Sequence, residues 1–162
     1  MQLARSRLIF FLAMWVALAA IGAAYYLECV VELHPCPLCL VQRFFLALFA
    51  LIALAATLHR PGSKGTRRYG VAGLLCLLPG ALASIRQLWL QNHILTLDNI
   101  CYPDLGYLFK TEPLLSTLKV LALGTPECGQ VNWTLLDMSI PEWSLLAFAG
   151  LAVLMVSQIF NR

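Results

Sequence analysis

Four long apolar segments, separated by polar stretches, dominate the pattern of hydrophobic and polar positions along the chain. They cover approximately residues 8–27, 38–58, 69–90 and 143–160. About 20 consecutive apolar residues are enough for an α-helix to cross a bilayer, and each segment is close to that length. The pattern therefore predicts an all-α membrane protein, a bundle of four transmembrane helices in a single domain.

Three polar connections join the apolar segments, at residues 28–37, 59–68 and 91–142. The third connection is long. Its residues 113–123 place leucines on one helical face and polar side chains elsewhere. This spacing predicts a short amphipathic helix, which either lies on the membrane surface or covers the end of the bundle.

The basic residues divide these connections into two groups. Seven of the eleven Lys and Arg residues lie at the termini or in the second connection, namely Arg5, Arg7, Arg60, Lys64, Arg67, Arg68 and Arg162. Because basic residues gather on the cytoplasmic side, we expect both termini and residues 59–68 in the cytoplasm. All eight acidic residues fall in the other two connections. The net charge of +3 is thus a topology signal, and no basic stripe with interleaved aromatics suggests nucleic-acid binding.

Composition agrees with a membrane protein, since 60% of the residues are hydrophobic and 12% are charged. A cleaved signal peptide is the alternative explanation for residues 8–27, because residues 19–24 within it offer small side chains, as a cleavage site would. The apolar run is longer than the roughly 7–15 residues of a signal-peptide core. A retained helix is therefore favoured.

A Cys-x-x-Cys motif, Cys36-Pro37-Leu38-Cys39, opens the second apolar segment. Pro37 suits the first position of a helix, which makes Cys36 the cap residue. The positive end of a helix dipole favours thiolate, the reactive form of cysteine. Arg43 follows Cys39 by four residues and so shares its helical face, about 6 Å deeper. A charge at that depth suggests a function, such as binding an anionic or carbonyl-bearing ligand.

Three simpler interpretations compete with a reactive dithiol. Cys-x-x-Cys can be half of a zinc site, but the sequence contains neither a second Cys-x-x-Cys nor a paired-histidine motif, and we expect no metal site. A permanent structural disulfide is the second, although so short a loop gains little from one. Arg43 can also be an anchor that reaches back to the membrane surface.

Four further residues bear on the chemistry. Cys101 and Cys128 lie in the long outer connection and can close it as a disulfide, although four outer cysteines allow three pairings. Cys29 we interpret as unpaired or accessory, and Cys76 as a buried structural residue. His93 can donate a hydrogen bond to a ligand near Arg43, or it can simply be solvated. Together, the cysteines suggest a relay from a soluble dithiol, through two disulfides, to a hydrophobic oxidant.

Along essentially its whole length the chain resembles the bacterial disulfide bond formation protein family, DsbB. The features that carry this resemblance are Cys36-Pro37-Leu38-Cys39 with Arg43, His93 after the third apolar segment, Cys101 and Cys128, Trp133, and Pro141-Glu142-Trp143. Their order and their placement relative to the apolar segments make the resemblance specific. It implies a thiol oxidase of the bacterial inner membrane with its redox loops in the periplasm.

The resemblance also implies roles for individual residues. A periplasmic thioredoxin-fold oxidase, DsbA, would attack Cys101 and so form a mixed disulfide. Cys128 would be the disulfide partner of Cys101 and would then exchange with Cys36. Cys39 would face a membrane quinone, either ubiquinone or menaquinone, and Arg43 would stabilise its thiolate. The resemblance places His93 near the quinone as well.

Three alternative functions differ in what they use the cysteines for. A vitamin K epoxide reductase-like protein also joins Cys-x-x-Cys to a quinone, but its motif lies near its last helices. A heavy-metal binding or uptake protein would use the outer cysteines as ligands. A structural membrane protein would keep two static disulfides.

Overall fold

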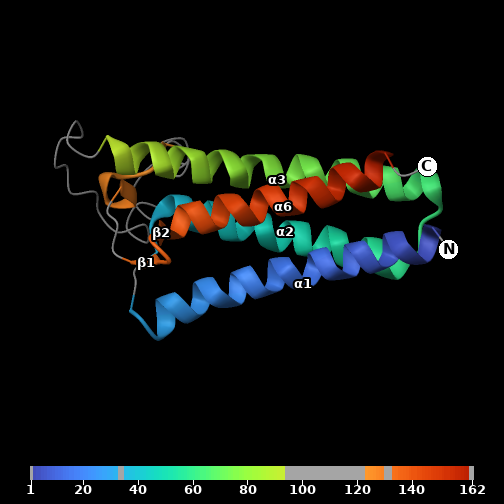
Figure 1. The fold of residues 1–162 in the computed structure, drawn as a ribbon, viewed down its shortest axis with the longest axis horizontal. Helices are drawn as coiled ribbons and strands as arrows, with labels where there is room; N and C mark the ends of the chain where they lie inside the picture. The colour runs from blue at the N-terminus through green and yellow to red at the C-terminus, as the bar shows by residue number, and fades with distance from the viewer. Residues whose placement is uncertain (1, 33–34, 94–122, 130–132, 161–162) are drawn as a thin grey trace, which may run out of the picture.

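The computed structural model describes residues 2–32, 35–93, 123–129 and 133–160. Four helices lie side by side along one axis (Figure 1). They are α1 (Gln2–Cys29), α2 (Pro37–His59), α3 (Ser63–Asn92) and α6 (Ile140–Phe160). Within the described residues, each of the four is long and apolar enough to cross a membrane. The expected all-helical, four-span architecture is confirmed, while the predicted helix at 113–123 lies outside the described residues.

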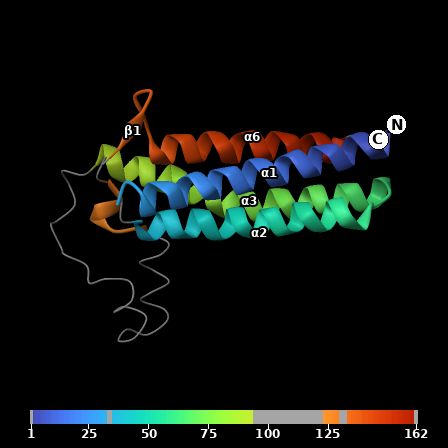
Figure 2. The same ribbon diagram turned by 90° about the horizontal axis from the view of Figure 1, so that it is seen from below.

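The two ends of the bundle differ in what they carry. The first residues of α1, the last residues of α6 and the α2–α3 connection share one end (Figure 2). The opposite end carries the start of α2, the 3₁₀ helix η2 (Pro126–Gly129) and a two-stranded hairpin. This arrangement matches the chain topology that the basic residues predict, with an even number of spans between the termini.

Helix α3 is longer than the apolar segment that predicted it. It begins at Ser63 rather than near 69, because the Thr66 amide donates to the Gly62 carbonyl at 2.9 Å and continues the helix into the basic residues. The turn before it is correspondingly short. Arg60 caps α2 in the left-handed conformation, with φ of 45°. Helix α3 also continues through Pro79, which lies inside the helix.

A small hairpin leads into α6. Strands β1 (Thr134–Leu135) and β2 (Met138–Ser139) pair antiparallel, with Leu136 and Asp137 at positive φ as a tight hairpin turn requires. Glu142 then caps the start of α6, because both the amide and the hydroxyl of Ser139 donate to its carboxylate, and the bond to the amide is one half of a capping box. This cap explains why α6 starts at Ile140, slightly before the predicted 143.

The main core joins all four helices in the middle of the bundle. Its largest fully buried side chains include Phe10, Phe49, Leu77, Leu151 and Met155. Cys76 lies in the same core, where its thiol donates to the Phe45 carbonyl at 3.4 Å. Its position is that of a small packing residue, as expected. Large apolar side chains also cover the outside of the helices, including Leu51, Leu75 and Val153, as a lipid-facing surface requires.

Close packing of α3 against α6 depends on a glycine. A Cβ atom added to Gly80 would lie 2.4 Å from the ring of Phe148, which is itself buried. Small residues at helix crossings allow backbones to approach closely inside a membrane. Because an aromatic ring packed in the core cannot move aside cheaply, Gly80 fixes the distance between these helices.

We therefore expect Gly80→Ala to destabilise the protein by about 1–3 kcal/mol, the usual range for overpacking a core. The measurement is the thermal unfolding midpoint in detergent. Gly150→Ala is the matched control, because Gly150 lies in α6 with nothing within 4 Å of an added Cβ. Equal midpoints for the two variants would contradict this account of the α3–α6 contact.

Candidate functional site

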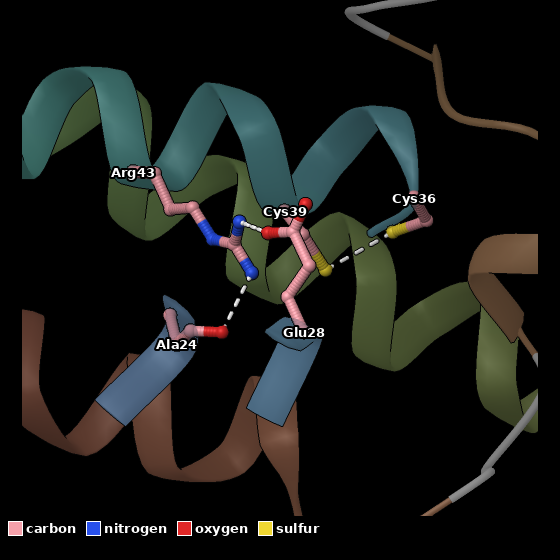
Figure 3. Close-up of polar contacts among 5 residues, drawn as sticks. All are labelled: Ala24, Glu28, Cys36, Cys39 and Arg43. Atoms are coloured by element: carbon pink, nitrogen blue, oxygen red, sulfur yellow. Dashed lines mark hydrogen bonds and ion pairs between the residues drawn. The ribbon is translucent and has the colours of Figure 1, made fainter. Parts of the chain in front are cut away.

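The Cys-x-x-Cys motif forms the first turn of α2, as predicted. Cys36 is the cap residue in an extended conformation, with φ of −74° and ψ of 161°, and Pro37 occupies the start of the helix. This geometry brings the two thiols together, with their sulfurs 3.1 Å apart (Figure 3). Both are free thiols here. The pair is arranged so that little movement separates the dithiol from a disulfide.

A third cysteine, which is distant in the sequence, lies close to this pair of thiols. Cys128 lies in η2, is only 1% exposed, and packs with Leu38 and Leu90 in a small core at this end of the bundle. Gly124 makes that approach feasible: it adopts φ of +76°, and an added Cβ would lie 2.7 Å from Leu38. The Cys36 side chain packs against this same small core. Cys36 therefore lies between two other cysteines.

The surroundings of Cys128 favour its thiolate. A hydrogen bond from Cys36 is the main cause that lowers the pKa of Cys128 to about 6, with help from the Leu38 backbone and from Thr125, although burial opposes the charge. The Thr125 hydroxyl lies 3.7 Å from the Cys128 sulfur. The same contact has the opposite effect on its donor, since hydrogen bonding to Cys128 raises the pKa of Cys36. Of these two thiols, Cys128 ionises first.

Two buried glutamines complete the thiol cluster. Gln87 of α3 places its amide nitrogen 3.6 Å from the Cys36 sulfur and 3.4 Å from the Cys39 sulfur. Gln42 of α2 donates to the Gln87 side-chain oxygen at 2.8 Å. Neither glutamine was predicted from the sequence as a site residue. The available signal was two glutamines inside predicted apolar spans, since polar side chains within a membrane are costly and usually functional.

Arg43 turns toward α1 rather than toward the surface. Its guanidinium forms an ion pair with Glu28 and donates to the Ala24 carbonyl at 3.0 Å (Figure 3). It also lies 5.1 Å from the centre of the Tyr25 ring. The side chains of Arg43 and Glu28 are 16% and 33% exposed, so the pair is partly shielded. The charge one turn below Cys39 is thus neutralised locally by the last turns of α1.

His93 ends α3 at the same end of the bundle. Its ring stacks on Trp89 with centroids 4.4 Å apart, and its Nδ1 lies 3.0 Å from the Trp89 carbonyl oxygen. Arg86 lies over the Trp89 ring at 4.4 Å and donates to the Leu123 carbonyl at 3.2 Å. Arg86 therefore holds the segment that leads into η2.

Comparison with known proteins gives this geometry a context. A family model described as "Disulfide bond formation protein DsbB" matches residues 6–158. Disulfide bond formation protein B 1 of Pseudomonas aeruginosa is 42% identical over 162 residues, covering 100% of this chain and 99% of that protein. Disulfide bond formation protein B of Stutzerimonas stutzeri is 40% identical with the same coverage. The chain belongs to the DsbB family.

A third relative is similar over nearly the same length. Disulfide bond formation protein B of Methylococcus capsulatus is 39% identical, covering 99% of this chain and 98% of that protein. No solved structure matches. Membership in the DsbB family confirms the resemblance expected from the sequence, and a membrane protein of disulfide bond formation with thiol oxidoreductase activity follows from it.

The structure brings together part of the expected site of this DsbB-family protein. Cys36, Cys39 and Cys128 form one cluster, and Arg43 lies a turn away in a pair with Glu28. Cys101 lies outside the described residues. Cys29 is an exposed free thiol at the end of α1, as expected for an accessory residue.

The ionisation of Cys128 can be followed by thiolate absorbance near 240 nm in the reduced protein. In a Cys39→Ser variant we expect a step with a midpoint near pH 6, above which Cys128 is a thiolate. The step should vanish when Cys128→Ser is added. Adding Cys36→Ala instead removes the main stabilising hydrogen bond and should move the midpoint up toward the ordinary value of 9.0. A Cys39→Ser protein without ionisation below pH 8 would contradict this picture.

Proposed function

We propose that this protein reoxidises a DsbA-like periplasmic partner and passes the electrons to a membrane quinone. The observation that carries the proposal is the position of Cys36, whose sulfur lies 3.1 Å from Cys39 and whose side chain packs against the small core that contains Cys128. A thiol that contacts two others can exchange disulfides with both. The cluster also lies at one end of four membrane-spanning helices, where water-soluble and lipid-soluble partners can both approach.

The relay begins in the long outer connection. A thiolate of the reduced partner attacks Cys101 of a Cys101–Cys128 disulfide, and Cys128 leaves with the electron pair. The second thiol of the partner then resolves the mixed disulfide, which oxidises the partner and leaves Cys101 reduced. The lowered pKa of Cys128 suits it to be the leaving group, since a thiol of low pKa leaves faster.

The second exchange takes place inside the cluster. The Cys128 thiolate attacks Cys36 of a Cys36–Cys39 disulfide, and Cys39 leaves as a thiolate. Cys101 then attacks Cys128 in the new mixed disulfide, which restores the Cys101–Cys128 bond and leaves Cys36 and Cys39 reduced. A membrane quinone is the acceptor that takes two electrons and two protons from this dithiol, so that the Cys36–Cys39 disulfide forms again. Each cycle thus transfers one electron pair from partner to quinone.

The required direction of transfer is consistent with a quinone. DsbA-type oxidants have a potential of about −120 mV, whereas glutathione and thioredoxin systems lie below about −180 mV and cannot reoxidise them. A quinone pool can do so while respiration removes its electrons. Ubiquinone and menaquinone both fit this requirement.

Residues near the cluster fit a quinone headgroup chemically. Arg43 is a cation that can donate hydrogen bonds to a carbonyl oxygen, and Tyr25 contributes an aromatic surface beside it. Both belong to a partly exposed site just below Cys39. His93, stacked on Trp89, is proposed as a second contact. In this proposal Arg43 exchanges part of its interaction with Glu28 for the quinone oxygen.

The proposed location is the bacterial inner membrane, with both termini in the cytoplasm. The basic residues gather at the end that carries the termini and the α2–α3 connection. The thiol cluster lies at the opposite end, which would face the oxidising periplasm. Redox-active disulfides persist in that compartment.

The test is anaerobic quinone reduction by the purified protein, followed by quinone absorbance after a reduced DsbA-like protein is added. We expect turnover in the wild type and none in Cys36→Ser or Cys39→Ser, because each substitution removes one sulfur of the membrane-end pair. Cys76→Ser is the matched control, since this cysteine lies in the main core away from the cluster. Normal turnover in either Cys36→Ser or Cys39→Ser would exclude the relay.

For Arg43→Leu we expect the KM for quinone to rise about tenfold or more, the usual cost of removing a charged hydrogen-bond donor. Glu28→Gln leaves the guanidinium without its carboxylate partner and should not raise that KM. Arg68→Leu, an exposed arginine near the other end of α3, is the control. An unchanged KM for quinone in Arg43→Leu would remove Arg43 from the quinone site.

A further inference from the structure

The buried pair of Gln42 and Gln87 has a geometry that simple packing does not require. Both side chains are 5% exposed, although each carries a strongly polar amide. Gln42 donates to the Gln87 oxygen at 2.8 Å, and the neutral Cys39 thiol lies 3.7 Å from the same oxygen, which leaves the Gln87 nitrogen free to donate. That nitrogen then lies 3.4 Å from the Cys39 sulfur and 3.6 Å from the Cys36 sulfur.

The number of donors matches the number of sulfurs. A primary amide carries two N–H groups, and in the described part of the chain both recorded acceptors of the Gln87 nitrogen are the sulfurs of the motif. A neutral thiol is a weak acceptor, whereas a hydrogen bond to an ionised group is roughly twice as strong as a neutral one. Burial strengthens such a bond further, because the surroundings have a low dielectric constant.

We propose that Gln87 is a catalytic residue that holds the thiolate of the Cys36–Cys39 pair through its two N–H groups, and that Gln42 is a positioning residue that fixes the amide in this orientation. Gln87 thus acts as an oxyanion hole does, except that the charge it meets is on sulfur. The helix dipole alone cannot provide a directed donor for both sulfurs, whereas one amide from α3 contacts both.

The Gln87 amide contacts the sulfur on which negative charge develops during the proposed relay. When Cys128 attacks Cys36, the Cys36–Cys39 bond breaks and the electron pair stays on Cys39, within reach of the Gln87 amide. No proton needs to arrive in that step. The inference rests on the proposed function for its timing, but the contact between amide and thiolate can be tested without any quinone or protein partner.

The test uses the full-length reduced protein in detergent with Cys36→Ala as background, so that Cys39 is the remaining sulfur beside Gln87. Alkylation of Cys39 by iodoacetamide is followed on its own peptide by mass spectrometry. At pH 7 we expect Gln87→Leu to slow alkylation about tenfold, since the thiolate loses a charge-assisted hydrogen bond. At pH 10, above the usual pKa of a thiol, the Gln87→Leu protein should be alkylated at least as fast as the background, which shows that access is unchanged.

Gln158→Leu is the matched control. Gln158 is a glutamine that is 1% exposed at the opposite end of α6, with its side-chain oxygen unpartnered within the described residues. In the Gln158→Leu protein, Cys39 should be alkylated at the background rate at both pH values. A Gln87→Leu protein that matches the background at pH 7, or that stays slower at pH 10, would overturn the proposal.

The role of Gln42 is tested by a double-mutant cycle on the same rate at pH 7. Gln42→Leu should slow alkylation less than Gln87→Leu does, and it should have no further effect in a Gln87→Leu protein. Additive effects would show that Gln42 does not act through Gln87. Quinone turnover in the Cys36-containing protein is a separate readout: if the wild type shows none while the alkylation results hold, the proposed function fails and the thiolate contact stands.

Discussion

A thiolate buried at the end of an apolar helix bundle needs hydrogen-bond donors, and this requirement governs the arrangement around Cys36. The charged form of a buried group is costly unless it is paired or hydrogen-bonded. Donors reach the three sulfurs from three different parts of the chain: the first turn of α2, the amide of Gln87 on α3, and Thr125 beside η2. Cys36 itself donates to Cys128. A negative charge can therefore move between sulfurs without leaving a set of donors that the fold has already placed.

The bundle around the cluster is built to keep these donors in register. Gly80 lets α3 and α6 approach closely, and the turns of α3 beyond it carry Gln87 to the level of the Cys-x-x-Cys motif. At that level η2 packs on α2 and α3 through Leu38 and Leu90, which holds Cys128 against Cys36. Helix α1 is joined to the site differently, through the ion pair of Glu28 with Arg43. The site thus depends on contacts among α1, α2 and α3, whereas α6 supports it by packing against α3.

Local features of this fold were predictable from the sequence, and contacts between distant segments were not. The four spans, the cap at Cys36 and the first-turn position of Pro37 follow from short-range chemistry, because length, helix position and backbone geometry decide them. The start of α3 at Ser63 was missed because hydropathy marks the apolar span and not the helix that continues beyond it. Gln87 was missed for another reason: its importance comes from Gln42 and Cys39, which are more than forty residues away in the sequence. No pattern of nearby residues in the sequence predicts such a contact between distant residues.

The sequence pattern identified Arg43 as an unusual charge, but it did not predict that Arg43 forms an ion pair with Glu28. An isolated charge near the hydrocarbon is expensive, so the fold neutralises it with a carboxylate from the last turns of α1. Because the pair keeps some contact with its surroundings, it can be rearranged at lower cost than two fully buried charges. In the proposed function, a neutral quinone oxygen can then share the guanidinium without separating two fully buried charges. The ion pair with Glu28 therefore neutralises Arg43 when no ligand is bound, and it still leaves the guanidinium able to bind a ligand.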